Sequence, residues 1–142
     1  MKVFDRCDSI VVVLDPGEKI MESLLKVVSD KGIKAGFLFG LGAGKNFTLG
    51  YYDLEKKEYI RKEFPEEHEI TSMVGNVGIL DDKPILHIHI TLSDREFRAF
   101  GGHLFEGTIT GTLEAVIYRD NGRIVRKFYP DRNLALVDNV ED

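Results

Sequence analysis

The sequence predicts a single α+β domain, residues 1–142, in which a mainly antiparallel β-sheet is covered by one or two helices. Short runs of apolar and β-branched residues, separated by polar turns, recur along most of the chain and are typical of strands. Only the segment between Asp15 and Gly32 places apolar side chains at helical spacing. No linker or internal repeat divides the chain, and 142 residues are enough for one hydrophobic core.

Composition excludes several protein classes. Hydrophobic residues make up 43% of the chain and charged residues 30%, as in soluble globular domains. The start of the chain has no signal-peptide pattern, and no apolar run approaches the ~20 residues of a membrane span. A single cysteine, Cys7, excludes an internal disulfide, so we expect a cytoplasmic protein.

Charge argues against DNA as the main partner. The formal net charge of −5 has the wrong sign for a domain that binds DNA by neutralising phosphates. The one modest basic grouping, which we interpret as a solvated face, consists of Arg95, Arg98, Arg126 and Lys127. We therefore expect DNA binding to be weak or absent.

The first elements are two short strands and a helix. Residues 3–14 are rich in apolar and β-branched side chains and predict the strands. The helix is expected to open after Asp15, which can cap its first turn together with Glu18 in a capping box. Gly32 is the expected stop at its C-terminal end. The apolar stripe of this helix predicts that it covers the sheet.

Further strands are predicted before the histidines, at residues 33–41, 46–53, 58–64 and 69–80. The first of these ends in Gly40-Leu41-Gly42-Ala43-Gly44-Lys45, a glycine-rich segment that we expect to form a loop. One interpretation of this segment is a tight turn or close backbone packing. The other is a loop in which the amides of Gly42 and Gly44, with Lys45, bind an anion or small ligand. The spacing is not that of a P-loop.

The strand predicted at residues 85–92 contains two candidate metal ligands. Side chains alternate between the two faces of a strand, so His87 and His89 point to the same side, ~6.5–7 Å apart along the strand. Two imidazoles at this spacing can lean onto one metal ion at ~2.0–2.1 Å. His103 follows two glycines that let the backbone turn or approach closely, and it is our candidate for the third ligand.

Neutral imidazoles suit divalent transition metals, and zinc is the ion we expect. The alternative interpretation is that these histidines are half-buried structural residues. The remaining histidine, His68, is either a fourth ligand or, as we prefer, a solvated loop residue. Glu114, Glu69 and Asp94 are candidates for a general base or for an acceptor that orients a ligating histidine, and otherwise are ordinary surface carboxylates.

The C-terminal part predicts a hairpin. Residues 107–118 alternate as a long strand. The following Asp120-Asn121-Gly122-Arg123 is typical of a two-residue hairpin turn, so residues 124–129 are expected to return along that strand. The tail after Pro130 is apolar enough to pack back onto the domain.

Together these motifs resemble the PPC domain, a family named for plants and prokaryotes, over nearly the whole chain. The matching pieces are Leu41-Gly42-Ala43-Gly44, residues 69–76, Leu86-His87-Ile88-His89, Gly101-Gly102-His103-Leu104 and the strand around Glu114. The resemblance implies an α+β fold that assembles as a homotrimer. It also implies that His87, His89 and His103 are the histidines that form a metal site in prokaryotic members.

Two features of the plant relatives are missing. Those proteins join the domain to AT-hook segments that act on AT-rich DNA, and this chain has no Arg-Gly-Arg-Pro hook. Their Gly-Arg-Phe-Glu-Ile-Leu motif, linked to partner binding, corresponds here to residues 66–71, which keep only Glu69 and Ile70 of it. The resemblance therefore does not carry DNA binding or the plant partners to this chain.

Three functions stay open. The first is a metal-binding homotrimer with a regulatory or ligand-binding role, and it is the one we prefer. The second is a metal-dependent hydrolase or lyase, because three histidines leave a coordination position open for water or substrate. The third is a DNA-binding protein.

Overall fold

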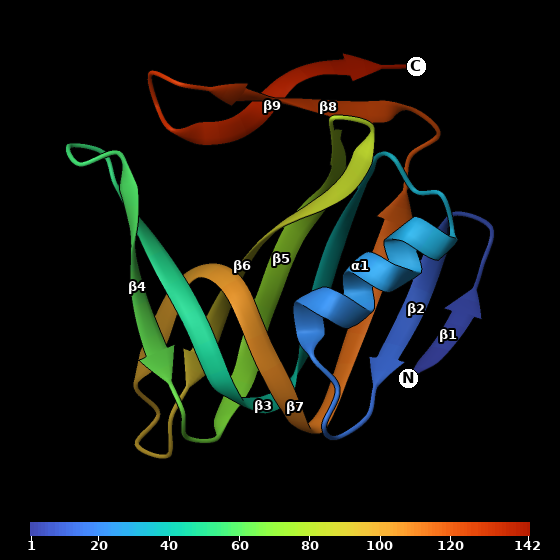
Figure 1. Cartoon of the computed structure of the whole chain (residues 1–142). Helices are drawn as coiled ribbons and strands as arrows, with labels where there is room; N and C mark the ends of the chain where they lie inside the picture. Colours follow the sequence, from blue (N-terminus) through green and yellow to red (C-terminus); the bar gives the residue numbers. More distant parts are fainter.

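The computed structural model describes residues 1–142 and contains one helix and nine strands in a single sheet (Figure 1). In chain order the elements are β1 (Lys2–Asp5), β2 (Ser9–Leu14), α1 (Ile20–Asp30), β3 (Gly36–Asp53), β4 (Glu58–Phe64), β5 (His68–Leu80), β6 (Lys83–Ser93), β7 (Ala99–Arg119), β8 (Arg123–Tyr129) and β9 (Leu134–Glu141). The predicted α+β class fits broadly, although the helical share is small. The one helix, α1, has 11 residues and is too short to span a membrane.

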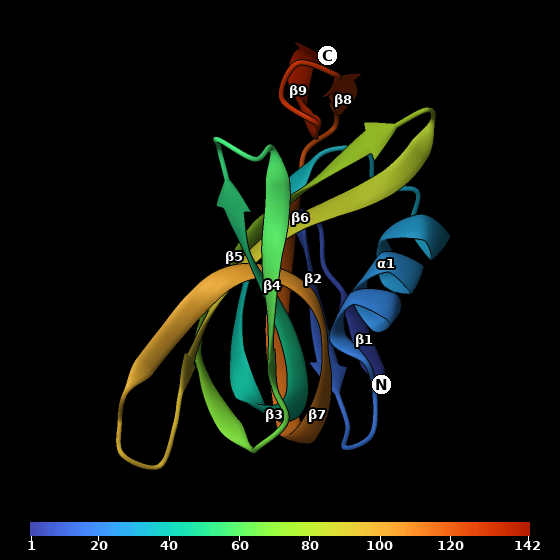
Figure 2. The same ribbon diagram turned by 60° about the vertical axis from the view of Figure 1, so that its left-hand side comes forward.

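The sheet is organised around two long strands, β3 and β7. β7 pairs with β2, β3 and β6, and β3 pairs with β4, β5 and β7. Because β6 pairs with both β5 and β7, the sheet curls back on itself, and Figure 2 shows β7 arching through the molecule. A two-residue turn joins β5 to β6 at Asp81 and Asp82, which both have positive φ, as in the tightest hairpins.

The helix α1 lies over the sheet (Figures 1 and 2), and one cluster of buried apolar side chains joins it to β2, β3, β5, β6 and β7. The helix buries the stripe that its sequence predicts, and it ends before Gly32, whose φ of +63° is the expected left-handed stop. β2 and β6 each turn alternate apolar side chains into this core. The fully buried members from α1 and β2 are Ile20, Leu24, Val28, Ile10, Val12 and Leu14.

The predicted capping box forms only in part and does not cap the helix. The Glu18 carboxylate accepts from the N–H of Asp15 at 2.8 Å, but α1 begins at Ile20. The N–H groups of Met21 and Glu22 donate to the carboxylate of Glu106, at 2.9 and 3.4 Å. The Asp15 carboxylate instead pairs with the α-amino group of the chain at 2.8 Å. A carboxylate from β7 therefore stabilises the positive end of the helix dipole, a contact that no local motif encodes.

The predicted glycine-rich loop is also wrong, because β3 continues through it without a break. Gly42 and Gly44 lie between β5 and β7 and pair with both, so their backbone groups belong to the sheet. A Cβ on Gly42 would collide with the carbonyl oxygen of Thr112, and the register shifts on either side of it. The glycines therefore serve close backbone packing at β-bulges, as the first of the two interpretations expects.

The predicted C-terminal hairpin is the third correction. β8 does not return along β7 but pairs with β9, and it meets β5 in parallel at one position. The chain after β7 is held elsewhere, since the N–H groups of Asp120 and Ile124 donate to the carbonyls of Ala35 and Lys34. The tail does pack back, as β9, and the β8–β9 pair lies across one end of the molecule (Figure 1).

Candidate metal centre

β6 confirms the predicted strand and presents its two histidines on one face. Ile88 and Ile90 are buried in the core beneath α1, so His87 and His89 project from the opposite face. His87 is half-buried and His89 is exposed. The alternation that the sequence predicts therefore sets the direction of both imidazoles.

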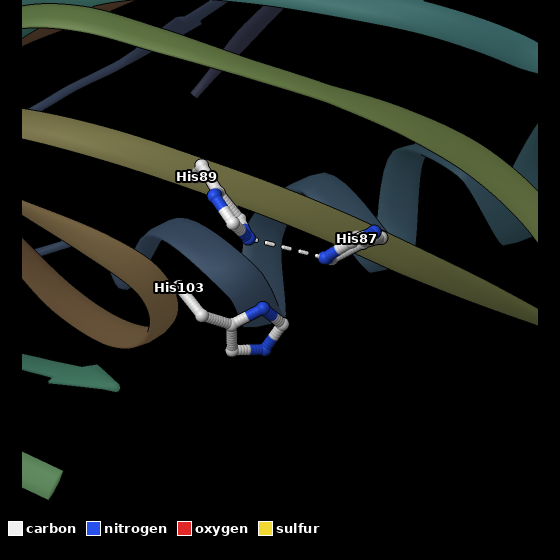
Figure 3. A group of neighbouring side chains, drawn as sticks. All are labelled: His87, His89 and His103. Atoms are coloured by element: carbon white, nitrogen blue, oxygen red, sulfur yellow. Dashed lines mark hydrogen bonds between the residues drawn. The ribbon is translucent and has the colours of Figure 1, made fainter. Parts of the chain in front are cut away.

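Strand pairing supplies the third histidine. β7 begins at Ala99, earlier than the sequence predicts, because its first residues pair with β6. In this pairing His103 lies directly opposite His89, and directly opposite residues share a face of the sheet. Figure 3 shows the three rings converging, His87 and His89 from one strand and His103 from its neighbour.

The spacing of the three imidazoles suits one ion. The Nε2 atoms of His87 and His89 lie 3.2 Å apart, and a tetrahedral ion with ~2.0–2.1 Å bonds separates two nitrogen ligands by ~3.3 Å. One nitrogen from each ring, His103 included, falls within 4.8 Å of the others. The buried Nδ1 of His103 has no hydrogen-bond partner. An ion in this group would take up the lone pair of a ring nitrogen that the protein itself leaves without a partner.

The surroundings of His87 and His103 lower the pKa values of both imidazole rings. Burial lowers the pKa of His87 to about 4, and the positive charges of Arg126 and His89 act in the same direction. Burial likewise lowers the pKa of His103 to about 4, with the charges of His87 and His89 as the next causes. Both rings are therefore neutral at pH 7, which is the form that binds a metal.

Sequence reasoning missed Arg126, which it placed in a solvated basic grouping. Arg126 is only 6% exposed. Its Nη2 lies 2.7 Å from the Oδ1 of Asn76 and 3.4 Å from the Nδ1 of His87. One signal could have found it, because Arg126 shares a face of β8 with the buried Ile124.

Two aromatic rings complete the surroundings. Tyr59 and Phe105 lie 5.0 and 4.9 Å from the His103 ring, measured between centroids. The guanidinium of Arg61 sits over Phe105 at 3.9 Å. Burial raises the pKa of Tyr59, so its phenol stays protonated at neutral pH.

The candidate carboxylates lie elsewhere on the sheet. Glu114 stands opposite Leu41 of β3, and Glu69 stands opposite Ser93 of β6. Asp94 binds Arg98 in the loop after β6. The group of ligand atoms that the structure brings together contains the three histidines and none of these carboxylates.

His68 is not a solvated loop residue. It is buried at the start of β5, where its Nδ1 lies 2.9 Å from the carbonyl oxygen of Glu66. Phe47, Phe64 and Phe100 surround the ring. It packs in this aromatic cluster and is not part of the histidine group.

Comparison with solved structures finds the same fold in several prokaryotic proteins. A metal-containing protein from Archaeoglobus fulgidus is 34% identical, with 98% of this chain and all of that one covered at a TM-score of 0.86. A candidate DNA-binding protein from Bacteroides thetaiotaomicron is 29% identical, with 96% of each chain covered and a TM-score of 0.93. A plant- and prokaryote-conserved (PPC) protein from Pyrococcus horikoshii is 28% identical, with 99% of this chain and 95% of that chain covered at a TM-score of 0.85.

Comparison with curated protein sequences finds no match. The family model of the Plants and Prokaryotes Conserved (PCC) domain matches residues 1–119, which hold all three histidines and every element up to the end of β7. The resemblance that the motifs suggest is therefore confirmed, and the chain belongs to the Plants and Prokaryotes Conserved (PCC) domain family.

Proposed function

We propose that this chain is a metal-binding protein that holds one divalent transition-metal ion through His87, His89 and His103. The convergence of three imidazoles from two paired strands carries the proposal. Zinc is the metal we expect, because it accepts three imidazole ligands and a fourth, exchangeable one. The description of the Archaeoglobus relative as metal-containing supports the same interpretation.

A regulatory or ligand-binding role fits the surroundings better than hydrolysis or lyase chemistry. The polar side chains beside the histidines are Arg126 and Asn76, with the protonated phenol of Tyr59 nearby. None of these is an ordinary general base at neutral pH. An ion held by three histidines would still leave one position open, so a small ligand could reach it.

Elemental analysis of protein purified without an affinity tag tests the metal proposal. We expect one zinc ion per chain for the wild type, and less than about a tenth of that for the double variant His87→Ala with His89→Ala, because one imidazole alone binds weakly. His68→Gln is the matched control, since it removes a histidine outside the group and should keep the zinc. Wild-type protein that neither carries nor takes up zinc at pH 7 would refute the proposal.

We also propose that the protein is a homotrimer, as the family resemblance implies. Support comes from an exposed apolar patch formed by Phe37, Phe39, Leu41, Val74 and Tyr118. Phe39 lies opposite Val74, and Val74 lies opposite His89, so the patch and the histidines share one face of the sheet. Contiguous exposed apolar surface of this kind is typical of subunit interfaces.

Light scattering at micromolar concentration tests the trimer. The double change Phe37→Glu with Phe39→Glu should dissociate it, because it places charges in the centre of the patch. Leu54→Glu, in the exposed turn between β3 and β4 and 81% exposed, is the control and should leave the mass unchanged. A wild type that is monomeric across this range would contradict the proposal.

We expect the protein to work in the cytoplasm. Its one cysteine, Cys7, is free and exposed. A free surface thiol is in keeping with a reducing compartment.

A further inference from the structure

The buried guanidinium of Arg126 is the feature that the metal proposal does not use. Its Nη1 donates to the carbonyl of Ala135 at 3.0 Å and its Nη2 to the Oδ1 of Asn76 at 2.7 Å. The buried Nε has no acceptor. No carboxylate lies within ion-pair distance of this side chain, although ten other ion pairs are present in the molecule. A buried cation without a counter-ion costs free energy of folding, which an anion bound to Arg126 would offset.

The charges around the histidines are all of one sign. Arg126 contacts the Nδ1 of His87 at 3.4 Å. Arg61 sits over the Phe105 ring, which packs on His103. The only charge interaction that favours the guanidinium is with the phenol of Tyr59, a neutral group at pH 7. A divalent ion held by three neutral imidazoles would add two positive charges to this group. The loaded centre would therefore attract an anion strongly.

Metal binding would also free a donor on Arg126. The Nε2 of His87 faces the other histidines, while its Nδ1 accepts the weak 3.4 Å contact from Arg126. A neutral imidazole carries a single proton, so a ring that gives Nε2 to a metal keeps its proton on Nδ1. Two N–H groups would then face each other, and the guanidinium would need a different acceptor.

We propose that the centre binds a small organic carboxylate, with one carboxylate oxygen on the metal and the other accepting from the guanidinium of Arg126. A guanidinium N–H donates a charge-assisted hydrogen bond to a carboxylate oxygen. Tyr59 and Phe105, packed on the His103 ring, offer apolar contact to the organic part of the ligand. This inference rests on the proposed metal site, and it names the class of ligand that the open position takes.

The test uses the full chain loaded with cobalt(II), whose visible absorption changes when its ligands change. Cobalt uptake is measured first, and benzoate is then titrated as the probe carboxylate. We expect benzoate to shift the spectrum of the wild type, and Arg126→Met to weaken benzoate binding by about 10- to 100-fold, the usual loss for a charge-assisted hydrogen bond. Arg98→Met, a surface arginine 67% exposed in its side chain, is the matched control and should bind benzoate as the wild type does.

Two further measurements separate a ligand-binding role from a purely structural one. Without benzoate, Arg126→Met should bind cobalt at least as tightly as the wild type, because it removes a positive charge near the ion. Melting in chelator should show that this variant folds, since methionine keeps an unbranched side chain in a buried position. If it does not fold, Arg126→Lys replaces it. This variant should lose benzoate affinity because one ammonium group cannot donate to Ala135, Asn76 and the carboxylate together.

The outcomes distinguish this inference from the metal proposal. Failure of the wild type to take up cobalt would refute the metal proposal and this inference with it. A cobalt-loaded wild type whose spectrum ignores benzoate, or an Arg126→Met variant with unchanged benzoate affinity, would overturn the inference and leave the metal site standing. Binding of inorganic phosphate in place of benzoate would overturn the assignment to organic carboxylates.

Discussion

The double change His87→Ala with His89→Ala gives the sharpest test of whether these histidines are ligands or structural residues. Both side chains project away from the core, and Ile88 and Ile90 stay buried beneath them. The apo protein should therefore lose little more than the contact between the two Nε2 atoms and the weak contact of His87 with Arg126, about 1 kcal/mol each. Most of the difference between wild type and variant should appear only with metal.

The magnitude follows from linkage. At a hundredfold excess of zinc over its dissociation constant, binding to the folded state adds ~2.7 kcal/mol. An unfolding entropy of ~2.1 cal/mol/K per residue over the 142 residues converts this to about 9 °C in Tm. We expect this rise for the wild type on adding zinc, no rise for the double variant, and a variant Tm close to that of the chelated wild type.

Calorimetric melting of both proteins, each in chelator and in zinc at one protein concentration, makes the comparison. The structural interpretation predicts the opposite pattern. Core-filling histidines would leave cavities costing several kcal/mol with or without metal. A variant that melts far below chelated wild type, together with a wild type that ignores zinc, would refute the ligand assignment.

Four other predictions concern protons, the helix cap and DNA. The pKa values of His87 and His103 are lowered to about 4, so protons should begin to compete with zinc for these two ligands near pH 4 and not near the usual imidazole pKa of ~6.5. Calorimetry of zinc binding at pH 5.5 should therefore find fewer than two protons released per zinc. A release of three protons would contradict this prediction. The same lowered pKa values mean that the unfolded chain binds more protons than the folded one between about pH 6.5 and pH 4. The free energy of unfolding of the chelated protein should therefore fall as the pH drops through that window. Urea titrations that give the same free energy of unfolding across it would count against this prediction. Glu106→Ala should cost about 1 kcal/mol in chelated melting, because it removes the acceptor for the first turn of α1, whereas Glu106→Gln should recover part of the loss. Duplex DNA should bind weakly at physiological salt, given the net charge of −5; nanomolar affinity for AT-rich duplex with ~10³-fold preference over random sequence would overturn this expectation.

Local pattern was enough to predict the parts of the fold whose forces are local. The strand that carries His87 and His89, the strand β4, and the stripe and end of α1 all follow from alternation, periodicity and glycine placement. The direction of two of the three histidines therefore follows from the order of residues along one strand. The convergence of His103 depends on the pairing of β6 with β7, and the sequence alone identifies only a residue within reach.

The errors share a physical origin, since each concerns a contact between distant segments. Glycines are typical both of turns and of closely spaced strands. Only the position of Thr112 on β7 shows that Gly42 lies between closely spaced strands. The turn signal after β7 was outweighed by backbone bonds to Ala35 and Lys34. Arg126 looked like a surface charge because its partners, Asn76 and His87, come from other strands.

The two-residue turn at Asp81 and Asp82 has a consequence for how this family can vary in length. The turn fixes the register of β6 on β5, since Leu80 and Lys83 are the closing pair. One residue inserted there without a compensating bulge would rotate every side chain of β6 to the opposite face, so that His87 and His89 would enter the core and Ile88 would face water. A length change in a short exposed turn would therefore remove the histidine centre in a single step, whereas longer insertions after β6 would leave the pair in place.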